Sequence, residues 1–245
     1  MIKEIEVFSS AGSFHEEELR GKTAVVIDVL RASSTIATAL HNGAKGIIPV
    51  ADMAAATKIA QNLDSPYYLL CGEKNGEKIE GYDLGNSPLE YTPETVEGKT
   101  IILNTTNGTK ALMRCSLAKE VMTGSFLNMG SLLGELKKKE EIVLVCAGWR
   151  GRLSLEDLLC AGHIIYELTE GRLPDNARDG AKVAFGLYEK FGNDIEGTVQ
   201  SSNHAVRLRG IVGVDDIAFC CNVSTMDVLP IMNEGIISDF YGKKK

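Results

Sequence analysis

The sequence predicts an α/β fold with three layers, α/β/α, in which helices cover both faces of a largely parallel or mixed central sheet. Short apolar runs recur along the chain, and most are followed within a few residues by a segment with helical spacing. Strands that alternate with helices across short turns are typical of a sheet covered on both faces. With 245 residues, of which 44% are hydrophobic, we expect a single domain over residues 1–245.

The clearest βα unit covers residues 22–50. An unbroken apolar run at 24–27 predicts a buried strand that ends at Asp28, and helical spacing begins near Ile36 after a polar turn. A second strand is expected at 46–50. The other expected elements are strands at 2–8, 67–71 and 142–146, helices at 51–63, from about 155, and at 173–191, and an apolar strand or tail after 228.

Two features interrupt this regular alternation. Residues 72–91 contain four glycines and one proline without periodicity, which predicts a long loop, and long ordered loops usually have a function. In addition, residues 99–112 repeat the pattern of 22–40: Lys-Thr, an apolar strand, a Ser/Thr-rich turn and a helix that reaches Ala-Leu. The domain could therefore be built from repeated βα units, around 22–50, 99–125 and 140–165, although chance similarity of such units is common.

Composition limits the function classes. A net charge of −7 argues against nucleic acid and anionic membranes as partners, because counterion release requires a basic surface. The six cysteines lack CxxC spacing and no signal peptide or membrane-length apolar run is present, so we expect reduced thiols in a cytoplasmic protein. The sequence leaves a homo-oligomer open.

The turn after the first buried strand carries the strongest chemical signal. It offers a carboxylate at Asp28, a guanidinium at Arg31 and hydroxyls at Ser33 and Ser34. A carboxylate beside hydrogen-bond donors at a helix start suits a divalent metal that bridges protein and phosphate. The alternative interpretation is that Asp28 only caps the following helix.

Other strand ends carry similar groups. Residues 104–109 place five hydrogen-bonding side chains in six positions, more than a capped turn needs. Glu73 and the turn at 146–148, with Gly148, also follow predicted strands. Because the carboxyl ends of parallel strands meet at one edge of a sheet, we expect these segments to form a single crevice with the Asp28 turn.

Four further groups have two interpretations each. Glu156 and Asp157 lie where a helix dipole favours acids, and we expect that only one of them, Asp157, serves as a metal ligand or supports one. Arg150 and Arg152 would either bind an anion or be solvated. His204 is either an acid/base group or a loop histidine, and Cys146 is expected to be a buried structural thiol.

Four long motifs together resemble the 2-phosphosulfolactate phosphatase family, which comprises magnesium-dependent enzymes of coenzyme M biosynthesis. These are IDVLRASSTIATAL (27–40), GEKNGEKIEGYDLGNSPLEY (72–91), LNTTNGTKAL (103–112) and CAGWRGRLSLEDLLCAG (146–162). The resemblance implies an α/β/α fold of the family's own type. It departs from the family at Lys74-Asn75, where Arg-Gly is common. The matching motif positions are Asp28, Arg31, Ser33, Asn86, Ser87, Asn104, Thr105, Asn107, Gly108, Glu156 and Asp157.

The resemblance implies hydrolysis of 2-phospho-3-sulfolactate to 3-sulfolactate and phosphate, with Mg²⁺ as cofactor and a small anion as the partner. We expect Asp28, with Glu73 or Asp157, to bind the metal, and Asp28, Arg31 and Asp157 to act in catalysis. Water attack and a phospho-enzyme both stay open, as do a different small organophosphate and a non-catalytic anion-binding protein. The expected substrate contacts are Arg31, Ser33, Ser34, Asn86, Ser87, Asn104, Thr105, Thr106, Asn107, Gly108 and Gly148.

Overall fold

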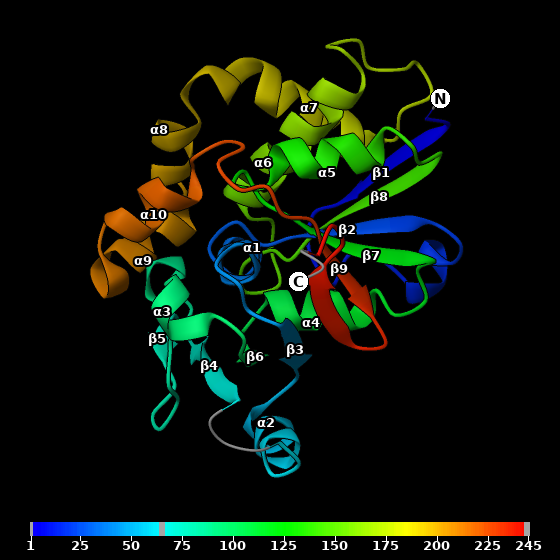
Figure 1. Ribbon diagram of the computed structural model, residues 1–245. Helices are drawn as coiled ribbons and strands as arrows, with labels where there is room; N and C mark the ends of the chain where they lie inside the picture. Colours follow the sequence, from blue (N-terminus) through cyan, green and yellow to red (C-terminus); the bar gives the residue numbers. More distant parts are fainter. Residues whose placement is uncertain (1, 64–66, 243–245) are drawn as a thin grey trace.

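The computed structural model describes residues 2–63 and 67–242, and Figure 1 shows its helices and strands. The strands are β1 (Glu4–Phe8), β2 (Thr23–Ile27), β3 (Gly46–Val50), β4 (Tyr68–Lys74), β5 (Glu77–Lys78), β6 (Thr100–Asn104), β7 (Glu120–Gly124), β8 (Glu141–Cys146), β9 (Pro230–Asn233) and β10 (Ile236–Asp239). The α-helices are α1 (Ala32–His41), α2 (Met53–Ala60), α3 (Pro93–Val96), α4 (Gly108–Arg114), α5 (Met129–Leu136), α6 (Leu155–Leu168), α7 (Asp179–Phe191), α8 (Ile195–Gln200), α9 (Asn203–Val212) and α10 (Asp215–Cys220), and short 3₁₀ turns are η1 (Glu16–Leu19), η2 (Pro88–Glu90) and η3 (Gly192–Asp194).

These strands form one mixed sheet in the order β1-β8-β2-β7-β9-β10-β3-β6-β4-β5. Two blocks within it are parallel: the first block is β1-β8-β2-β7 and the second block is β3-β6-β4. The β9-β10 hairpin lies between them and pairs antiparallel with β7 on one side and β3 on the other. Three antiparallel steps separate β7 from β3, so the two blocks run in opposite directions.

Helices cover both faces of each block, which confirms the predicted α/β fold. On the first block, α5, α6 and α7 pack with Val25 and Ile27, whereas α1 and α4 pack with the alternate residues Ala24 and Val26. The core around α1 and α4 also contains Ile101 of the second block, so these two helices lie between the blocks. The outer face of the second block is covered by α2. Figure 1 shows the resulting order of layers, with α1 and α4 near the centre.

Most predicted elements are confirmed, and the exceptions lie where polar residues dominate. The expectation of a structureless loop over 72–91 was wrong in part, because β4 continues to Lys74 and pairs with β5, and η2 follows. The polar stretch after Ser201 forms α9, whose first turn is capped by the hydroxyl of Ser202, which accepts a hydrogen bond from the Ala205 N–H at 3.0 Å. The expected apolar C-terminal strand is the β9-β10 hairpin.

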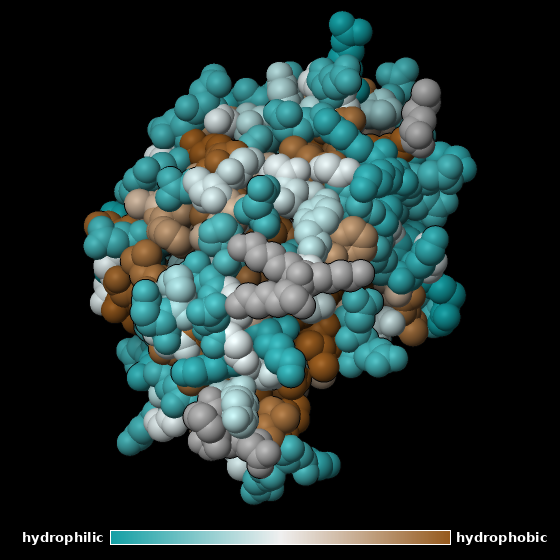
Figure 2. Space-filling view, in the orientation of Figure 1, coloured by the Kyte–Doolittle hydropathy of each residue, from teal (hydrophilic) through white to brown (hydrophobic). Residues whose placement is uncertain are grey.

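The surface shows no dominant apolar region on the face seen in Figure 2, where hydrophobic groups form small, separate patches among hydrophilic ones. No helix in the described part of the chain combines the length and apolar character of a membrane span. The six cysteines are all buried and free.

Candidate active site

The turn after β2 is built around the backbone of Asp28. The N–H of Asp28 donates to Ser33 Oγ at 3.0 Å, and that hydroxyl donates to the Val26 carbonyl at 3.2 Å. Ser34 Oγ donates to the Val29 carbonyl at 2.8 Å. Both serine hydroxyls therefore hold the turn in shape, and neither lines the pocket that the turn borders. The Asp28 side chain faces that pocket although it is only 6% exposed.

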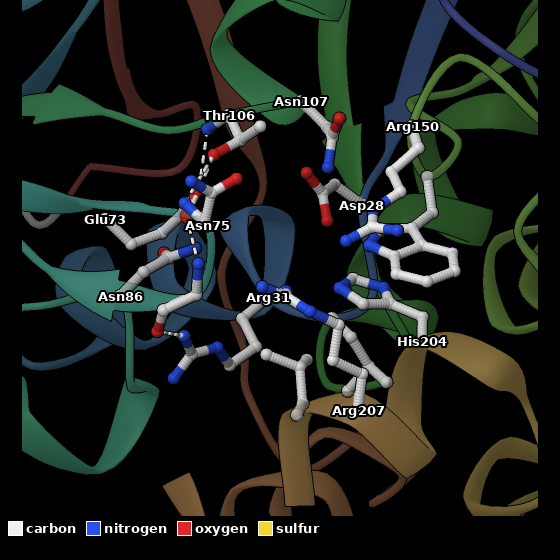
Figure 3. A pocket seen from close by; sticks show the side chains of 14 residues that line it. Asp28, Arg31, Glu73, Asn75, Asn86, Thr106, Asn107, Arg150, His204 and Arg207 are labelled. Carbon is white, nitrogen blue, oxygen red and sulfur yellow. Dashed lines mark hydrogen bonds between the residues drawn. The ribbon is translucent and has the colours of Figure 1, made fainter. Parts of the chain in front are cut away.

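The ends of four strands meet at this pocket, which we call the Asp28 pocket. Asp28 follows β2, Glu73 lies near the end of β4, Thr106 and Asn107 follow β6, and Arg150 follows β8. The predicted crevice is thus confirmed as a meeting place of these segments, and both blocks of the sheet contribute to it. Figure 3 shows the pocket, which is lined by Asp28, Leu30, Arg31, Glu73, Asn75, Gly76, Asn86, Thr106, Asn107, Trp149, Arg150, His204, Arg207 and Leu208.

The carboxylate of Glu73 joins two loops on one side of the pocket. It accepts hydrogen bonds from the Gly76 N–H at 2.6 Å, the Thr106 N–H at 2.6 Å and the Thr106 hydroxyl at 2.9 Å. A carboxylate offers about four lone-pair sites in total, so these three hydrogen bonds leave part of its capacity for a ligand. Glu73 therefore ties the β4-β5 turn to the loop after β6 and is held in one orientation at the pocket.

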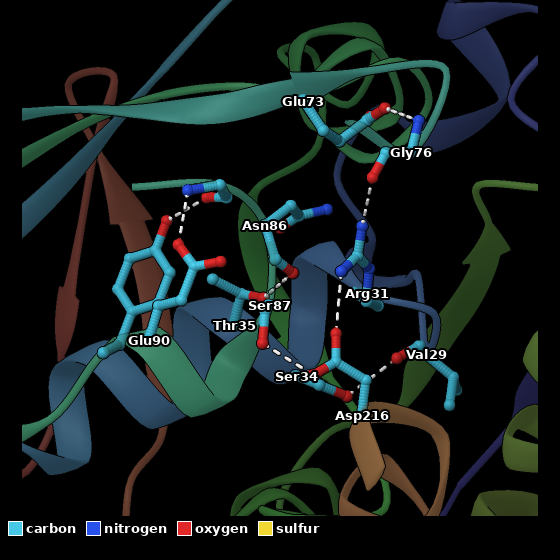
Figure 4. A network of polar contacts seen from close by, with 12 residues as sticks. Val29, Arg31, Ser34, Thr35, Glu73, Gly76, Asn86, Ser87, Glu90 and Asp216 are labelled. Carbon is cyan, nitrogen blue, oxygen red and sulfur yellow. Dashed lines mark hydrogen bonds and ion pairs between the residues drawn. The ribbon is translucent and has the colours of Figure 1, made fainter. Parts of the chain in front are cut away.

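Arg31 is buried at the pocket and is already paired. One terminal nitrogen donates to Asp216 Oδ2 at 2.7 Å and the other donates to the Gly76 carbonyl at 2.9 Å. The Ser87 hydroxyl donates to the second oxygen of Asp216 at 2.6 Å, as Figure 4 shows. A guanidinium has five N–H donors, so the pairing fixes the position of Arg31 and leaves other donors for a ligand. Ser87 does not line the pocket and acts on it through Asp216.

Asp157 lies behind the pocket lining rather than in it. One carboxylate oxygen accepts from the Val29 N–H at 2.9 Å and the other from the Gly148 N–H at 3.1 Å, so Asp157 connects the turns after β2 and β8. Burial raises the pKa of Asp157 well above its ordinary value, and the charges of Asp28 and Glu156 raise it further. The geometry gives no support to the metal-binding and catalytic roles that the sequence suggested for Asp157.

The other residues predicted to contact the substrate, Asn104, Thr105, Gly108 and Gly148, do not line the pocket. Thr105 Oγ1 accepts from the Thr109 N–H at 3.1 Å. A Cβ at position 108 would lie 2.6 Å from Asp28 Oδ2, so only glycine allows α4 to begin this close to Asp28. Gly148 has a φ of +72°, which favours glycine. Asn104 is the last residue of β6 and is buried.

His204, whose role the sequence left open, lies in the pocket lining together with Trp149. Its Nδ1 is 2.7 Å from Oε1 of the fully buried Glu156, and its ring stacks on Trp149 with a centroid distance of 5.3 Å. Burial alone would raise the pKa of Glu156, but the hydrogen bond and charge of His204 lower it below its ordinary value. Glu156 is therefore a carboxylate that holds the imidazole.

Two arginines at the pocket lack an acidic partner among the described residues. Arg150 lies over the Trp149 ring, 4.8 Å from its centroid, and Arg207 comes from α9. The salt bridges of the described chain include neither of them. The sequence indicated Arg150 as one of two alternatives and gave no signal for Arg207, because α9 is brought to the pocket by tertiary packing alone.

Burial also changes the acidity of Asp28. It raises the pKa of Asp28 to about 6, and the nearby carboxylates of Glu73 and Glu156 act in the same direction, while the charge of His204 opposes them. A cation bound at the pocket would relieve this repulsion and favour the ionised carboxylate. The pocket therefore combines two carboxylates that repel each other with basic groups around them.

The oxygen atoms of the pocket suit Mg²⁺ better than a metal that needs a complete protein cage. Among the described residues, no group of three His, Cys, Asp or Glu side chains is placed to hold a metal. However, Asp28 and Glu73 both line the pocket, and the buried Asn86 Oδ1, which also belongs to the lining, has no hydrogen-bond partner. Mg²⁺ is usually bound by one or two carboxylates, with waters and substrate phosphate completing its shell.

Comparison with known proteins identifies the family. A family model described as 2-phosphosulpholactate phosphatase matches residues 9–235. A probable 2-phosphosulfolactate phosphatase from Caldanaerobacter subterraneus subsp. tengcongensis is 41% identical over 234 residues, which cover 95% of this chain and 97% of that protein. The chain belongs to the 2-phosphosulfolactate phosphatase family. Proteins with the same printed name from Thermotoga petrophila (45% identical over 215 residues, 88% of this chain and 91% of that protein) and Clostridium perfringens (42% over 228 residues, 92% of each) agree.

The 2-phosphosulfolactate phosphatases are phosphoric monoester hydrolases. The match to this family covers the whole pocket. The matched range of 9–235 contains every residue of the lining, from Asp28 to Leu208. It also contains Glu156 and Asp216, which hold pocket residues from behind. The resemblance inferred from the four sequence motifs is thus confirmed at the level of the family.

Proposed function

We propose that this chain is a magnesium-dependent phosphatase that hydrolyses 2-phospho-3-sulfolactate to 3-sulfolactate and phosphate. The observation that carries the proposal is the meeting of Asp28 and Glu73 with three arginines in one pocket, Arg31, Arg150 and Arg207. Such a pairing suits a phosphate ester with further anionic groups, because carboxylates can hold the metal while guanidinium groups hold the anion.

Asp28, Glu73 and the amide oxygen of Asn86 are the groups that would hold Mg²⁺. All three are hard oxygen donors in the pocket lining, and the Asn86 oxygen has no other partner among the described residues. When bound, Mg²⁺ supplies a positive charge beside the phosphoryl group and its leaving oxygen. The three hydrogen bonds on Glu73 keep its carboxylate oriented toward the site without a change of conformation.

The substrate carries a phosphate, a sulfonate and a carboxylate, and the chain's own donors can bind these groups. Arg31 is held in place by Asp216 and lines the same pocket as Asp28. Arg150 and Arg207 are free to pair with an anion, and Asn107 adds an amide at the start of α4. These local charges explain how a protein with a net charge of −7 can bind a multiply charged anion.

The proposal is tested by measuring phosphate release from 2-phospho-3-sulfolactate at pH 7.5, with Mg²⁺ or with EDTA. We expect release only with Mg²⁺, and Asp28→Asn should lower kcat/KM by at least about 100-fold, equivalent to about 2.7 kcal/mol of barrier. The exposed Asp175→Asn serves as the matched control and should leave the rate unchanged.

Three outcomes would contradict parts of this proposal. Full activity of Asp28→Asn would remove Asp28 from the chemistry, and activity in EDTA would remove the metal. A higher kcat/KM for another small phosphate ester in a substrate panel would reassign the substrate. Binding of sulfolactate without release of phosphate from any ester would identify a protein that only binds anions.

A further inference from the structure

The metal and anion binding proposed above does not use the short hydrogen bond between His204 and Glu156. Glu156 is 0% exposed in the first turn of α6, and Nδ1 of His204 lies 2.7 Å from its Oε1. Its other oxygen, Oε2, has no hydrogen-bond partner among the described residues. Burying a carboxylate is costly unless it is paired, so its pairing with His204 is the interaction that accounts for its position.

This hydrogen bond fixes the tautomer of His204. An ionised carboxylate only accepts hydrogen bonds, so Nδ1 must carry the proton that points at Glu156. The second ring nitrogen, Nε2, has no hydrogen-bond or ion-pair partner within residues 2–63 and 67–242. The ring also stacks on Trp149, with an interplanar angle of 18°, which restricts its rotation. Figure 3 shows the His204 ring projecting into the same space as the Asp28 carboxylate.

The charged groups around His204 come from several elements. Glu156 contacts it from α6, Asp28 faces it from the turn after β2, and Arg150 and Arg207 line the same pocket from the turn after β8 and from α9. The ring edge that carries Nε2 is therefore left for the proposed substrate in this pocket. Because the Nδ1 proton is held by Glu156, Nε2 donates a hydrogen bond there when the ring is the doubly protonated imidazolium.

We propose that His204 is a further catalytic residue, which protonates the leaving oxygen of the substrate through Nε2, and that Glu156 is its positioning residue. This inference rests on the proposed phosphatase function. In the step, the bond between phosphorus and the ester oxygen breaks, and its electron pair stays on that oxygen. The oxygen takes the Nε2 proton of the imidazolium, which leaves the neutral ring with its proton on Nδ1. A water molecule forms the new bond to phosphorus and releases a proton to solvent, from which Nε2 regains its own.

A pair of matched substrates tests this role. One is 2-phospho-3-sulfolactate, and the other is its analogue with sulfur in place of the bridging ester oxygen, whose thiolate leaves without needing a proton because thiols are far more acidic than alcohols. We expect His204→Gln to lower kcat on the oxygen ester by about 100-fold or more, the range of general acid catalysis. The loss on the sulfur analogue should be less than about 10-fold, with little change in KM for either substrate.

Glu156→Gln should show a smaller loss with the same preference for the sulfur analogue, because the ring keeps Nε2 but loses its orientation. The ratio of the two rates is measured on one preparation, so partial unfolding of a variant cancels. The exposed His41→Gln is the control and should alter neither rate. Equal losses on both substrates, or no loss in His204→Gln, would overturn the proposal while leaving the phosphatase function intact. If the wild type hydrolyses neither substrate, the proposed function itself fails.

Discussion

Asp216 decides how Arg31 can act, although it does not line the Asp28 pocket. The side chains of Arg31 and Asp216 are 2% and 4% exposed, and they form a short ion pair that Ser87 supports. A buried pair of this kind contributes little net stability compared with apolar residues, but removal of one partner leaves an unpaired buried charge. The pair therefore serves to hold Arg31 in one position.

Asp216→Ala should lower the free energy of unfolding by about 3–5 kcal/mol, because the Arg31 guanidinium would stay buried without its carboxylate. The loss is measured by urea unfolding at pH 7.5. Glu17→Ala, which breaks the exposed pair between Glu17 and Arg20, is the control and should leave the unfolding curve unchanged. An Asp216→Ala variant as stable as the wild type would show that Arg31 readily reaches solvent.

Single residues were predictable from sequence where a strand end places them. Asp28 and Asn107 follow strands and Glu73 lies near the end of one, and the structure finds all three in the pocket lining. Arg207 and Asp216 gave no such signal, since helical periodicity does not reveal which distant loop a helix will cover. Their positions depend on how α9 and α10 pack, which is a property of the folded chain.

The sequence also could not distinguish side chains that bind a ligand from side chains that hydrogen-bond to the backbone. Ser33, Ser34 and Asp157 were expected at the substrate or metal because they are polar and close to Asp28 in the turn or in a motif. In the structure their oxygens bind backbone N–H or C=O groups of the turns. Buried backbone groups need partners, and a sequence does not show which nearby hydroxyl or carboxylate will satisfy them.

At the scale of elements, the approach of α4 to α1 positions the Asp28 carboxylate. A Cβ on Gly108 would lie 2.5 Å from the Cβ of Ala32 and 2.6 Å from Asp28 Oδ2, distances that side chains do not tolerate. The starts of α1 and α4 therefore meet because residue 108 is glycine. The Ser/Thr-rich turns of the sequence predicted both helix starts, but the contact between them depends on the missing side chain.

Gly108→Ala should separate the starts of α1 and α4 and displace Asp28. We expect the unfolding free energy to fall by about 1–3 kcal/mol, the usual cost of overpacking. The value of kcat/KM for phosphate release should fall by about 100-fold, since a shift of 1 Å at a catalytic group has effects of this size.

Gly134→Ala in α5 is the matched control for this substitution, because nothing lies within 4 Å of the added Cβ. Alanine is the better helix former, so this variant should be more stable by up to about 1 kcal/mol with unchanged activity. If Gly108→Ala behaves like Gly134→Ala, the two helices do not constrain Asp28.

At the scale of the whole molecule, the chain crosses twice between the two blocks of the sheet. It passes from β2 through α1 to β3, and later from β6 through α4 back to β7. β2 and β6 are each central strands, flanked by β8 and β7 in one block and by β4 and β3 in the other. These reciprocal crossovers coincide with the sequence echo between 22–40 and 99–112. Duplication of this unit stays a prediction, and the topology supports it.

Sequence periodicity predicted the strands and helices but not this arrangement. We expected one parallel edge to collect the functional turns, whereas two blocks of opposite direction both present their carboxyl ends to the Asp28 pocket. A strand such as Gly46–Val50 has the same apolar pattern whether it pairs with β2 or, as found, with β6 and β10. The choice of neighbour depends on long-range packing around α1 and α4.

The β9-β10 hairpin connects the two blocks within the sheet, and Ile237 is its contact with the second block. Ile237 is 0% exposed, pairs with Ile47 of β3 and belongs to the core around α1 and α4, whereas its neighbour Ile236 is 45% exposed. Ile237→Ala should therefore lower the unfolding free energy by about 2–5 kcal/mol, the usual cost of truncating a buried isoleucine.

Because both blocks supply residues to the Asp28 pocket, we also expect Ile237→Ala to raise KM for 2-phospho-3-sulfolactate at temperatures where the variant stays folded. Urea unfolding and steady-state phosphate release provide the two measurements. Ile236→Ala changes an exposed position of the same strand, so it should alter stability by less than about 0.5 kcal/mol and leave KM unchanged. A destabilised Ile237→Ala variant with the wild-type KM would mean that α1 and α4 alone keep the two blocks in register around the substrate.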